Sequence, residues 1–247
     1  MIFKHHEFTL DPSPQIGRAR QILIKPCAGY PTPYPVTTSR ETLERVITAI
    51  RKTSEADIII LDGSSHQESM FSLYQSLSYD FPRVLTMDVR ECVLVEVENP
   101  LLHPFAVPTF WLPNLVLYCD YLISIAPFKV LGHQGSFSIY NLLSLLPVSK
   151  YQGGTEHGWG ALYSLGIQKV LADLYFTLPF DLGIIDAKTK LLSADSPSQG
   201  EEESYGKIFV GEPYAVDKEA TVASGVATEY LTLIETAKSQ FEFEDIF

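Results

Sequence analysis

The stretch that decides the fold opens with QILIKP (Gln21–Pro26) and closes with DIIILDG (residues 57–63). Both are short isoleucine-rich runs bounded by turn-forming residues, a pattern typical of buried strands. The apolar residues between them recur at helical spacing, which predicts a helix with one buried face (Leu43, Val46, Ile47 and Ile50), and Thr38 with Glu41 fits a capping box at its start. Strand, helix and strand form a βαβ unit, whose strands are parallel.

Two further segments, YLISIAPFK (residues 121–129) and DLGIID (residues 181–186), also read as buried strands. We therefore predict an α/β fold with three layers, in which a mostly parallel central sheet carries helices on both faces. We expect a single domain over residues 1–247. It includes an extended N-terminal arm (1–19) and an acidic, aromatic tail (239–247) that adds an edge strand or docks on a partner.

The remaining segments complete this prediction. We expect helices at 68–79, 167–176 and 228–238, another opening at Pro213, a buried helix at 137–146, strands at 84–89, 93–97, 116–118 and 207–210, and irregular or loop structure at 99–113, 150–160 and 193–204.

Composition narrows the classes of function. The chain has 247 residues, of which 46% are hydrophobic, and a formal net charge of −12. The negative charge disfavours nonspecific binding to nucleic acid or anionic membranes. No apolar run approaches the length that spans a bilayer. The opening MIFKHHEFTLDPSPQ lacks the apolar core of a secretory signal, so we expect a cytoplasmic protein.

The predicted strands deliver charged residues to one sheet edge. In parallel α/β sheets ligands bind at the carboxyl ends of the strands. Lys25 and Lys129 there would form a cationic pocket for phosphate or carboxylate, and Thr37-Thr38 would add hydroxyls and free amides at a helix start. The alternatives are ordinary surface lysines and a simple helix cap.

Carboxylates and histidines allow other chemistry at this edge. Asp62 and Asp186 both end apolar strands, so together they could hold a divalent metal or share acid–base work, or each could cap a turn. His133 and His157 lie in glycine-rich loops, where a working histidine is often found and where surface histidines are also common.

Cys27 has two possible interpretations. Cys27 follows Lys25-Pro26, where a nearby cation suits a nucleophile, although a small buried residue is the simpler interpretation. The sequence contains neither a P-loop nor GxSxG, and GxGxxG does not follow the first strand.

The ordered motifs of residues 20–220 resemble the family catalogued as domain of unknown function 362. In the first half of the chain, IKPC at 24–27 resembles the family motif I-K-P-N, TTSR at 37–40 resembles T-T-x-P, and DG at 62–63 resembles a strand end in D-G. In the middle, PFK at 127–129 with His133 resembles P-K-x-K-T-H, and YNLL at 140–143 resembles K-N-L-F-G. Towards the end, His157 before ADL at 172–174 resembles a loop histidine before an A-D-L helix, IDA at 185–187 resembles V-D-G, and EPYAVD at 212–217 resembles D-P-V-A-V-D. Cys27 and Ala187 depart from the family pattern.

The resemblance implies an α/β fold and a site that includes Lys25, Thr37, Asp62, Lys129, His133, Asn141 and Asp217. Some members of the family are joined to iron–sulfur ferredoxin modules, which suggests a redox context. Only three cysteines are present, too few for a complete four-cysteine cluster within this chain.

Three hypotheses remain open. In the first, the protein binds a small anionic metabolite and its catalytic residues are Lys129, His133 and Asp62. The ligand-binding residues are Lys25, Cys27, Thr37, Thr38, Asn141, His157 and Asp217. Asp62 and Asp186 could in addition hold a divalent metal. In the second, a noncatalytic protein keeps the fold with a filled crevice and binds a protein partner or a second copy of itself. In the third, it is a redox accessory protein that meets an iron–sulfur partner through its acidic surface.

Overall fold

The predicted parallel strands are confirmed in a computed structural model, which describes residues 1–65, 68–153, 158–178 and 180–244. Four strands run parallel side by side: β9 (Leu182–Ser193), β7 (Tyr121–Leu131), β2 (Gln21–Pro26) and β3 (Asp57–Asp62). A fifth parallel strand, β4 (Val84–Asp88), follows β3 at one edge. The side-chain pattern explains this core, since Ile22, Leu23 and Ile24 are fully buried between two layers of helices.

Antiparallel strands extend the parallel core, so the complete sheet is mixed, although most of its strands are parallel. The described residues form an eight-stranded sheet in the order β1-β10-β9-β7-β2-β3-β4, with β8 paired to β7. The antiparallel members are β1 (Ile2–Lys4), β10 (Glu201–Gly211) and β8 (Gln134–Ser136). Within the expected extended arm, residues 2–4 are extended and pair with β10 at the sheet edge, whereas His5–Glu7 and Pro14–Arg18 are helical and correct that expectation.

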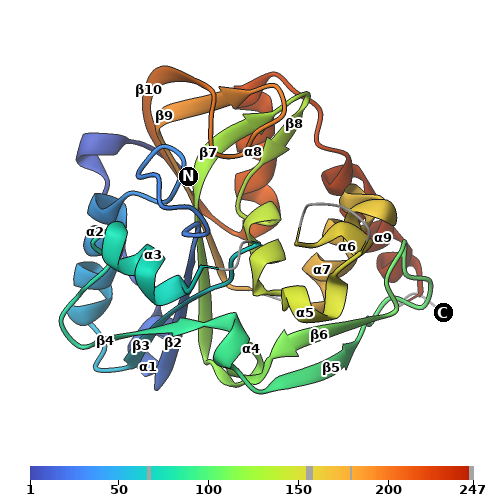
Figure 1. Ribbon diagram of the computed structural model, residues 1–247, viewed down its shortest axis with the longest axis horizontal. Helices are drawn as coiled ribbons and strands as arrows, with labels where there is room; N and C mark the ends of the chain where they lie inside the picture. Colours follow the sequence, from blue (N-terminus) through green and yellow to red (C-terminus); the bar gives the residue numbers. More distant parts are fainter. Residues whose placement is uncertain (66–67, 154–157, 179, 245–247) are drawn as a thin grey trace.

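Helices cover both faces of the sheet, as expected (Figure 1). On one face, α2 (Arg40–Arg51) and α3 (Met70–Ser76) pack on the alternate strand residues Ile22, Ile24, Ile58 and Ile60. The other face carries the 3-10 helix η3 (Tyr140–Leu145) together with α7 (Ile167–Thr177) and α9 (Glu229–Glu244). Helix α8 (Pro213–Ser224) begins at the predicted proline and lies near the β9–β10 hairpin. The shorter helices are η1 (His5–Glu7), α1 (Pro14–Arg18), η2 (Val89–Glu91), α5 (Val148–Tyr151) and α6 (Gly160–Ser164).

Several local predictions are wrong. The expected strand 116–118 is helical, because α4 spans Asn114–Tyr118. The segment 99–113, expected to be irregular, ends in β6 (Thr109–Pro113), which pairs with β5 (Leu94–Glu98) in a separate two-stranded sheet. The polar loop expected at 193–204 is shorter, since β10 already begins at Glu201. Residues 241–244 continue α9 and form no edge strand.

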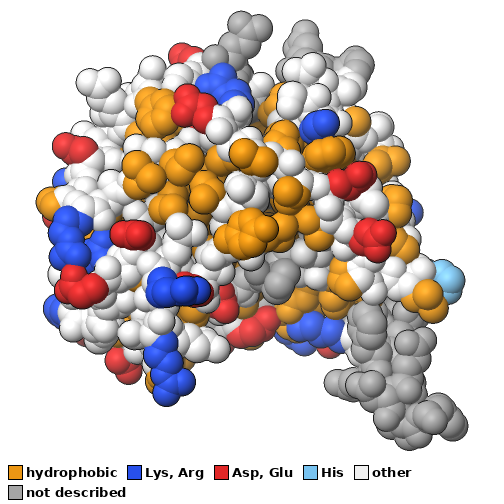
Figure 2. Space-filling model, turned by 90° about the horizontal axis from the view of Figure 1, so that it is seen from below, with side chains coloured by type: hydrophobic (Ala, Val, Ile, Leu, Met, Phe, Trp, Pro, Cys, Tyr) orange, Lys and Arg blue, Asp and Glu red, His pale blue; other side chains and the backbone are white. Residues whose placement is uncertain are grey.

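The face at the amino ends of the parallel strands carries apolar side chains (Figure 2). This end of the molecule holds α1 and α4 at the bottom of Figure 1, and Leu117 and Tyr118 of α4 are exposed. The site described below lies at the opposite, carboxyl ends of the strands, so these side chains do not belong to it. None of the helices that the structure describes is both long enough and apolar enough to cross a membrane.

Candidate functional site

A buried ion pair lies at the carboxyl ends of β2 and β3. Lys25 Nζ is 2.8 Å from Asp62 Oδ1, and the two side chains are 0% and 1% exposed. The parallel pairing of β2 with β3 places these residues on neighbouring strand ends, which the sequence predicted. Burying two charges is costly unless they are paired and hydrogen-bonded. The charge of Lys25 is therefore neutralised within the protein, and Lys25 is not a free anion-binding cation.

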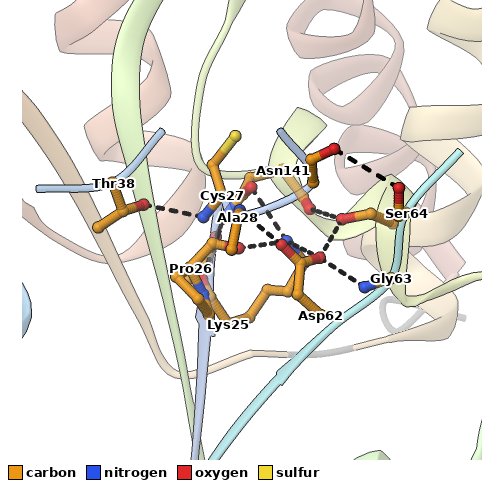
Figure 3. A network of polar contacts seen from close by, with 12 residues as sticks. Lys25, Pro26, Cys27, Ala28, Thr38, Asp62, Gly63, Ser64 and Asn141 are labelled. Carbon is orange, nitrogen blue, oxygen red and sulfur yellow. Dashed lines mark hydrogen bonds and ion pairs between the residues drawn. The ribbon is translucent and has the colours of Figure 1, made fainter. Parts of the chain in front are cut away.

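Asp62 uses both of its oxygens in a network of polar contacts (Figure 3). Oδ2 accepts a hydrogen bond from Ala28 N at 2.7 Å, and Oδ1 accepts from Gly63 N at 2.8 Å and from Ser144 Oγ at 2.6 Å. The carboxylate thus joins the loop after β2, the loop after β3 and the helix η3. Its geometry is that of a structural anchor.

Asn141 joins the same network from η3. Its Oδ1 accepts from Lys25 Nζ at 3.1 Å, while its Nδ2 donates to Lys25 O at 3.1 Å and to Ser124 Oγ at 3.0 Å. The resemblance included Asn141 in the site, and the structure places it at the edge of the cavity described next.

A cavity of about 430 Å³ lies above these strand ends. Its lining includes Cys27, Asp62, Lys129 and Asn141 of the predicted site residues. Lys129 is 3% exposed, and its Nζ lies 3.7 Å from Cys27 Sγ and donates to Pro197 O at 3.1 Å. Among the described residues, no carboxylate lies within ion-pair distance of Lys129. The cavity therefore contains a lysine that forms no ion pair with any residue that the structure describes.

Several aromatic side chains line the cavity, which the sequence did not predict. The aromatic lining residues are Tyr30, Phe137, Tyr140, Trp159 and Tyr163. They come from the loop after β2, from β8–η3 and from the start of α6, so no sequence spacing could have revealed their proximity. Burial raises the pKa of Tyr30, Tyr140 and Tyr163 above the ordinary phenol value, and Tyr140 and Tyr163 hydroxyls are 2.9 Å apart. These phenols stay protonated at neutral pH.

A turn of the β9–β10 hairpin closes one side of the cavity. Ala194, Asp195 and Pro197 line it, and Pro197 accepts the hydrogen bond from Lys129. These residues lie in the segment that the sequence predicted to be an exposed loop. A composition-based reading could not show that this loop folds back over the strand ends.

The two threonines have structural hydrogen bonds. Thr38 Oγ1 accepts from Cys27 N at 2.8 Å and donates to Ile125 O at 2.6 Å, and Thr37 Oγ1 donates to Thr32 O at 2.8 Å. The predicted cap is wrong in detail, because Ser39 and not Thr38 accepts from Thr42 N at the start of α2. Neither threonine is among the residues that line the cavity.

Asp186 lies apart from Asp62. Strands β7 and β2 separate β9 from β3, which places the two strand ends roughly 14 Å apart at the usual spacing of strands. Asp186 follows Ile184 by two residues and therefore lies on the same face of the sheet, the α2 side, where it accepts from Ser39 Oγ at 2.8 Å and Thr42 Oγ1 at 2.6 Å. The structure does not bring the proposed metal pair together. The residues that it describes contain no group of three or more metal-binding side chains.

Asp217 is a buried anchor beneath the site. It accepts from Ser138 N at 2.9 Å, Ser138 Oγ at 2.5 Å, Ile139 N at 3.0 Å and Tyr230 Oη at 2.7 Å. These bonds tie α8 and α9 to the segment that leads into η3, and Asp217 is not among the lining residues. Asp217 therefore holds the segment before η3 in place, and Phe137 of that segment lines the cavity.

We expect Asp217 to titrate well above an ordinary aspartate. Burial raises the pKa of Asp217 from 3.8 to about 6, and the donors from Ser138, Ile139 and Tyr230 act against this rise. Because the folded pKa exceeds the unfolded one, the associated stability is present below about pH 4 and is lost as the pH rises to about 6. Carbon-13 NMR of the carboxyl group measures the midpoint. Exposed Asp120 is the control, since amides of Arg20 and Gln21 lower its pKa; equal midpoints would contradict this expectation.

The structure describes one of the two loop histidines. His133 is exposed in the turn between β7 and β8 and is not among the lining residues. His157 lies outside the residues that the structure describes. Their place in glycine-rich loops suggested both histidines, and the family resemblance implied a site that includes His133.

The comparison with known families agrees with the motif order. The pattern of the Domain of unknown function (DUF362) family matches residues 22–221, so the chain belongs to this family. No curated protein matches the sequence significantly.

A solved structure is similar in fold. The lactate racemase apoprotein from Thermoanaerobacterium thermosaccharolyticum aligns with a TM-score of 0.54 and 14% sequence identity. The alignment covers 88% of this chain and 52% of the racemase, so this chain corresponds to about half of that protein. At this identity the likeness establishes a shared α/β fold.

Proposed function

We propose that this protein binds a small organic anion, carrying a carboxylate or a phosphate, in the cavity at the carboxyl ends of β2, β3 and β7. The observation that carries the proposal is Lys129, a buried lysine that lines the cavity without a counter-charge within ion-pair distance among the described residues. A buried cation of this kind is stabilised when an anion binds beside it.

The charge balance of the cavity favours a ligand with a single anionic group. The charges of Lys25 and Asp62 cancel at 2.8 Å, which leaves Lys129 to contact the anion. Asp195 also lines the cavity and disfavours a second negative group near the hairpin.

The aromatic walls favour a ligand with an apolar body. Tyr30, Trp159 and Tyr163 provide flat apolar surface, and a volume of about 430 Å³ is within the usual range for small-molecule sites. The cavity is open among the described residues, whereas the noncatalytic alternative expected a filled or missing crevice. We therefore favour ligand binding over a purely partner-binding role.

Thermal unfolding with candidate anions tests the proposal. Phosphate, acetate, lactate, benzoate and phenylacetate are the probes, and lactate is included because the similar fold is that of a lactate racemase. A ligand at 100 times its Kd stabilises the native state by about 2.7 kcal/mol, which raises the Tm of a chain of this size by roughly 5–10 °C. We expect benzoate or phenylacetate to give the larger shift.

Substitution of the lysine locates the binding site. Lys129→Met should abolish the shift, because the methionine keeps the apolar stem and removes the charge. Lys169→Met is the matched control, since Lys169 is exposed on α7 and should leave the shift unchanged. The proposal fails if no anion shifts the wild type or if the Lys129 variant retains the shift while its circular dichroism shows a native fold.

A further inference from the structure

Cys27 is a chemically distinct residue of the cavity. It follows the last residue of β2, is half-buried, and lines the cavity beside Lys129, whose Nζ lies 3.7 Å from Sγ. Its thiol also contacts Val36 O at 3.8 Å. Figure 3 shows the Cys27 side chain pointing away from the Lys25–Asp62 pair, so the sulfur does not take part in that network.

The other two cysteines provide an internal comparison. Cys92 Sγ lies 3.4 Å from Asp88 O and Cys119 Sγ lies 3.3 Å from Val116 O, and neither lines the cavity. Burial raises the pKa of both thiols to about 11. Because the thiolate is the reactive form of cysteine, both should react slowly at neutral pH.

We propose that Cys27 is a nucleophile of this cavity and forms a covalent bond with an electrophilic carbon of a small acid whose anionic group contacts Lys129. This inference rests on the proposed anion binding and adds a reaction to it. Two independent features support it: a sulfur that faces an open cavity, and a buried lysine without an ion-pair partner among the described residues that brings an anion to the same place.

The simplest form of the step is addition to a carbonyl. The sulfur of Cys27 forms a bond to the carbonyl carbon, and the π electron pair of the C=O bond moves to the oxygen. The thiol proton is transferred to that oxygen, which gives a hemithioacetal or hemithioketal without a leaving group, oxidant or reductant. Lys129 holds the acid group during the step and is not consumed.

Anionic and neutral alkylating agents test this arrangement. Iodoacetate and iodoacetamide both form an S–C bond with expulsion of iodide, but only iodoacetate carries the carboxylate that Lys129 would attract. Rates at each cysteine are followed by peptide mass spectrometry and compared with N-acetylcysteine in the same buffer. We expect the iodoacetate-to-iodoacetamide rate ratio at Cys27 to exceed that of N-acetylcysteine by about ten-fold or more. Cys92 and Cys119 should remain largely unlabelled.

Variants identify the cause of the preference. Lys129→Met should reduce the rate ratio at Cys27 to that of N-acetylcysteine, while Lys169→Met should leave it high. Bound phenylacetate should also protect Cys27 in the wild type. A ratio no higher than that of N-acetylcysteine, or an unchanged ratio in Lys129→Met, would overturn the proposal.

A second variant separates this inference from anion binding. Cys27→Ser removes the nucleophile but keeps Lys129, so it should retain the thermal shift with phenylacetate and lose labelling at position 27. If anions shift the wild type but Cys27 shows no charge preference in alkylation, the covalent role fails and anion binding stands. If no anion binds, both proposals fail together, and the thermal-shift result alone reveals this.

Discussion

Replacing Asp62 with asparagine should lower the free energy of unfolding by about 4 kcal/mol, the largest effect that we expect from one substitution. Asp62→Asn leaves the fully buried Lys25 without a counter-charge and turns an amide NH₂ toward groups that are themselves donors. Equilibrium denaturation in urea measures the loss.

Two controls distinguish this effect from an ordinary loss of a charge. Adding Lys25→Met to Asp62→Asn removes the stranded cation, so the double variant should be less destabilised than the sum of the two single variants by about 2 kcal/mol. Glu55→Gln breaks an exposed pair with Arg83 and should change the free energy of unfolding little, because solvent screens exposed charge pairs. A loss in Asp62→Asn as small as that in Glu55→Gln would show that the buried pair is not needed.

Replacing Asp186 with asparagine should lower the free energy of unfolding by about 3 kcal/mol. Asp186 is fully buried, accepts from Ser39, Thr42 and Lys188 N, and lies 3.5 Å from His5 Nε2. An amide cannot accept on both sides. Thr42→Val removes one of these donors and should cost about 1 kcal/mol.

The pH dependence of stability gives a second readout for Asp186. Burial alone would raise the pKa of Asp186, but the nearby imidazole of His5 and the hydrogen bond from Thr42 outweigh it and hold the pKa below 3.8. Because the folded pKa is lowered, the stability is present above the unfolded pKa and is lost as the pH falls through the folded pKa. The difference between wild type and Asp186→Asn should therefore shrink in acid. A constant difference would contradict this assignment.

The parallel core was predictable because its signal is local. The runs QILIKP and DIIILDG each match a buried strand, and the amphipathic spacing between them matches α2. The antiparallel part was less predictable. Residues 201–204 are all acidic or polar and exposed, and nothing in their composition shows that they pair with β9.

The position of the candidate site residues was predictable, but their contacts were less so. Strand-end reasoning identified Lys25, Asp62 and Lys129 correctly as neighbours of one edge. It could not tell that Lys25 and Asp62 neutralise each other or that Asp186 lies two strands away and is bound by Ser39 and Thr42, since both facts depend on strand order and side-chain direction. The aromatic walls come from segments far apart in the chain, so only the folded structure reveals them.

The β9–β10 hairpin has a consequence for how this fold could diversify. Its turn supplies Ala194, Asp195 and Pro197 to the cavity, while the two strands that it joins pair with each other from Leu192 and Glu201 onward. Insertions or deletions in such a turn are tolerated far better than changes in a buried strand. Relatives could therefore evolve different ligand sizes by altering the length of one surface turn while the ion pair and the sheet stay unchanged.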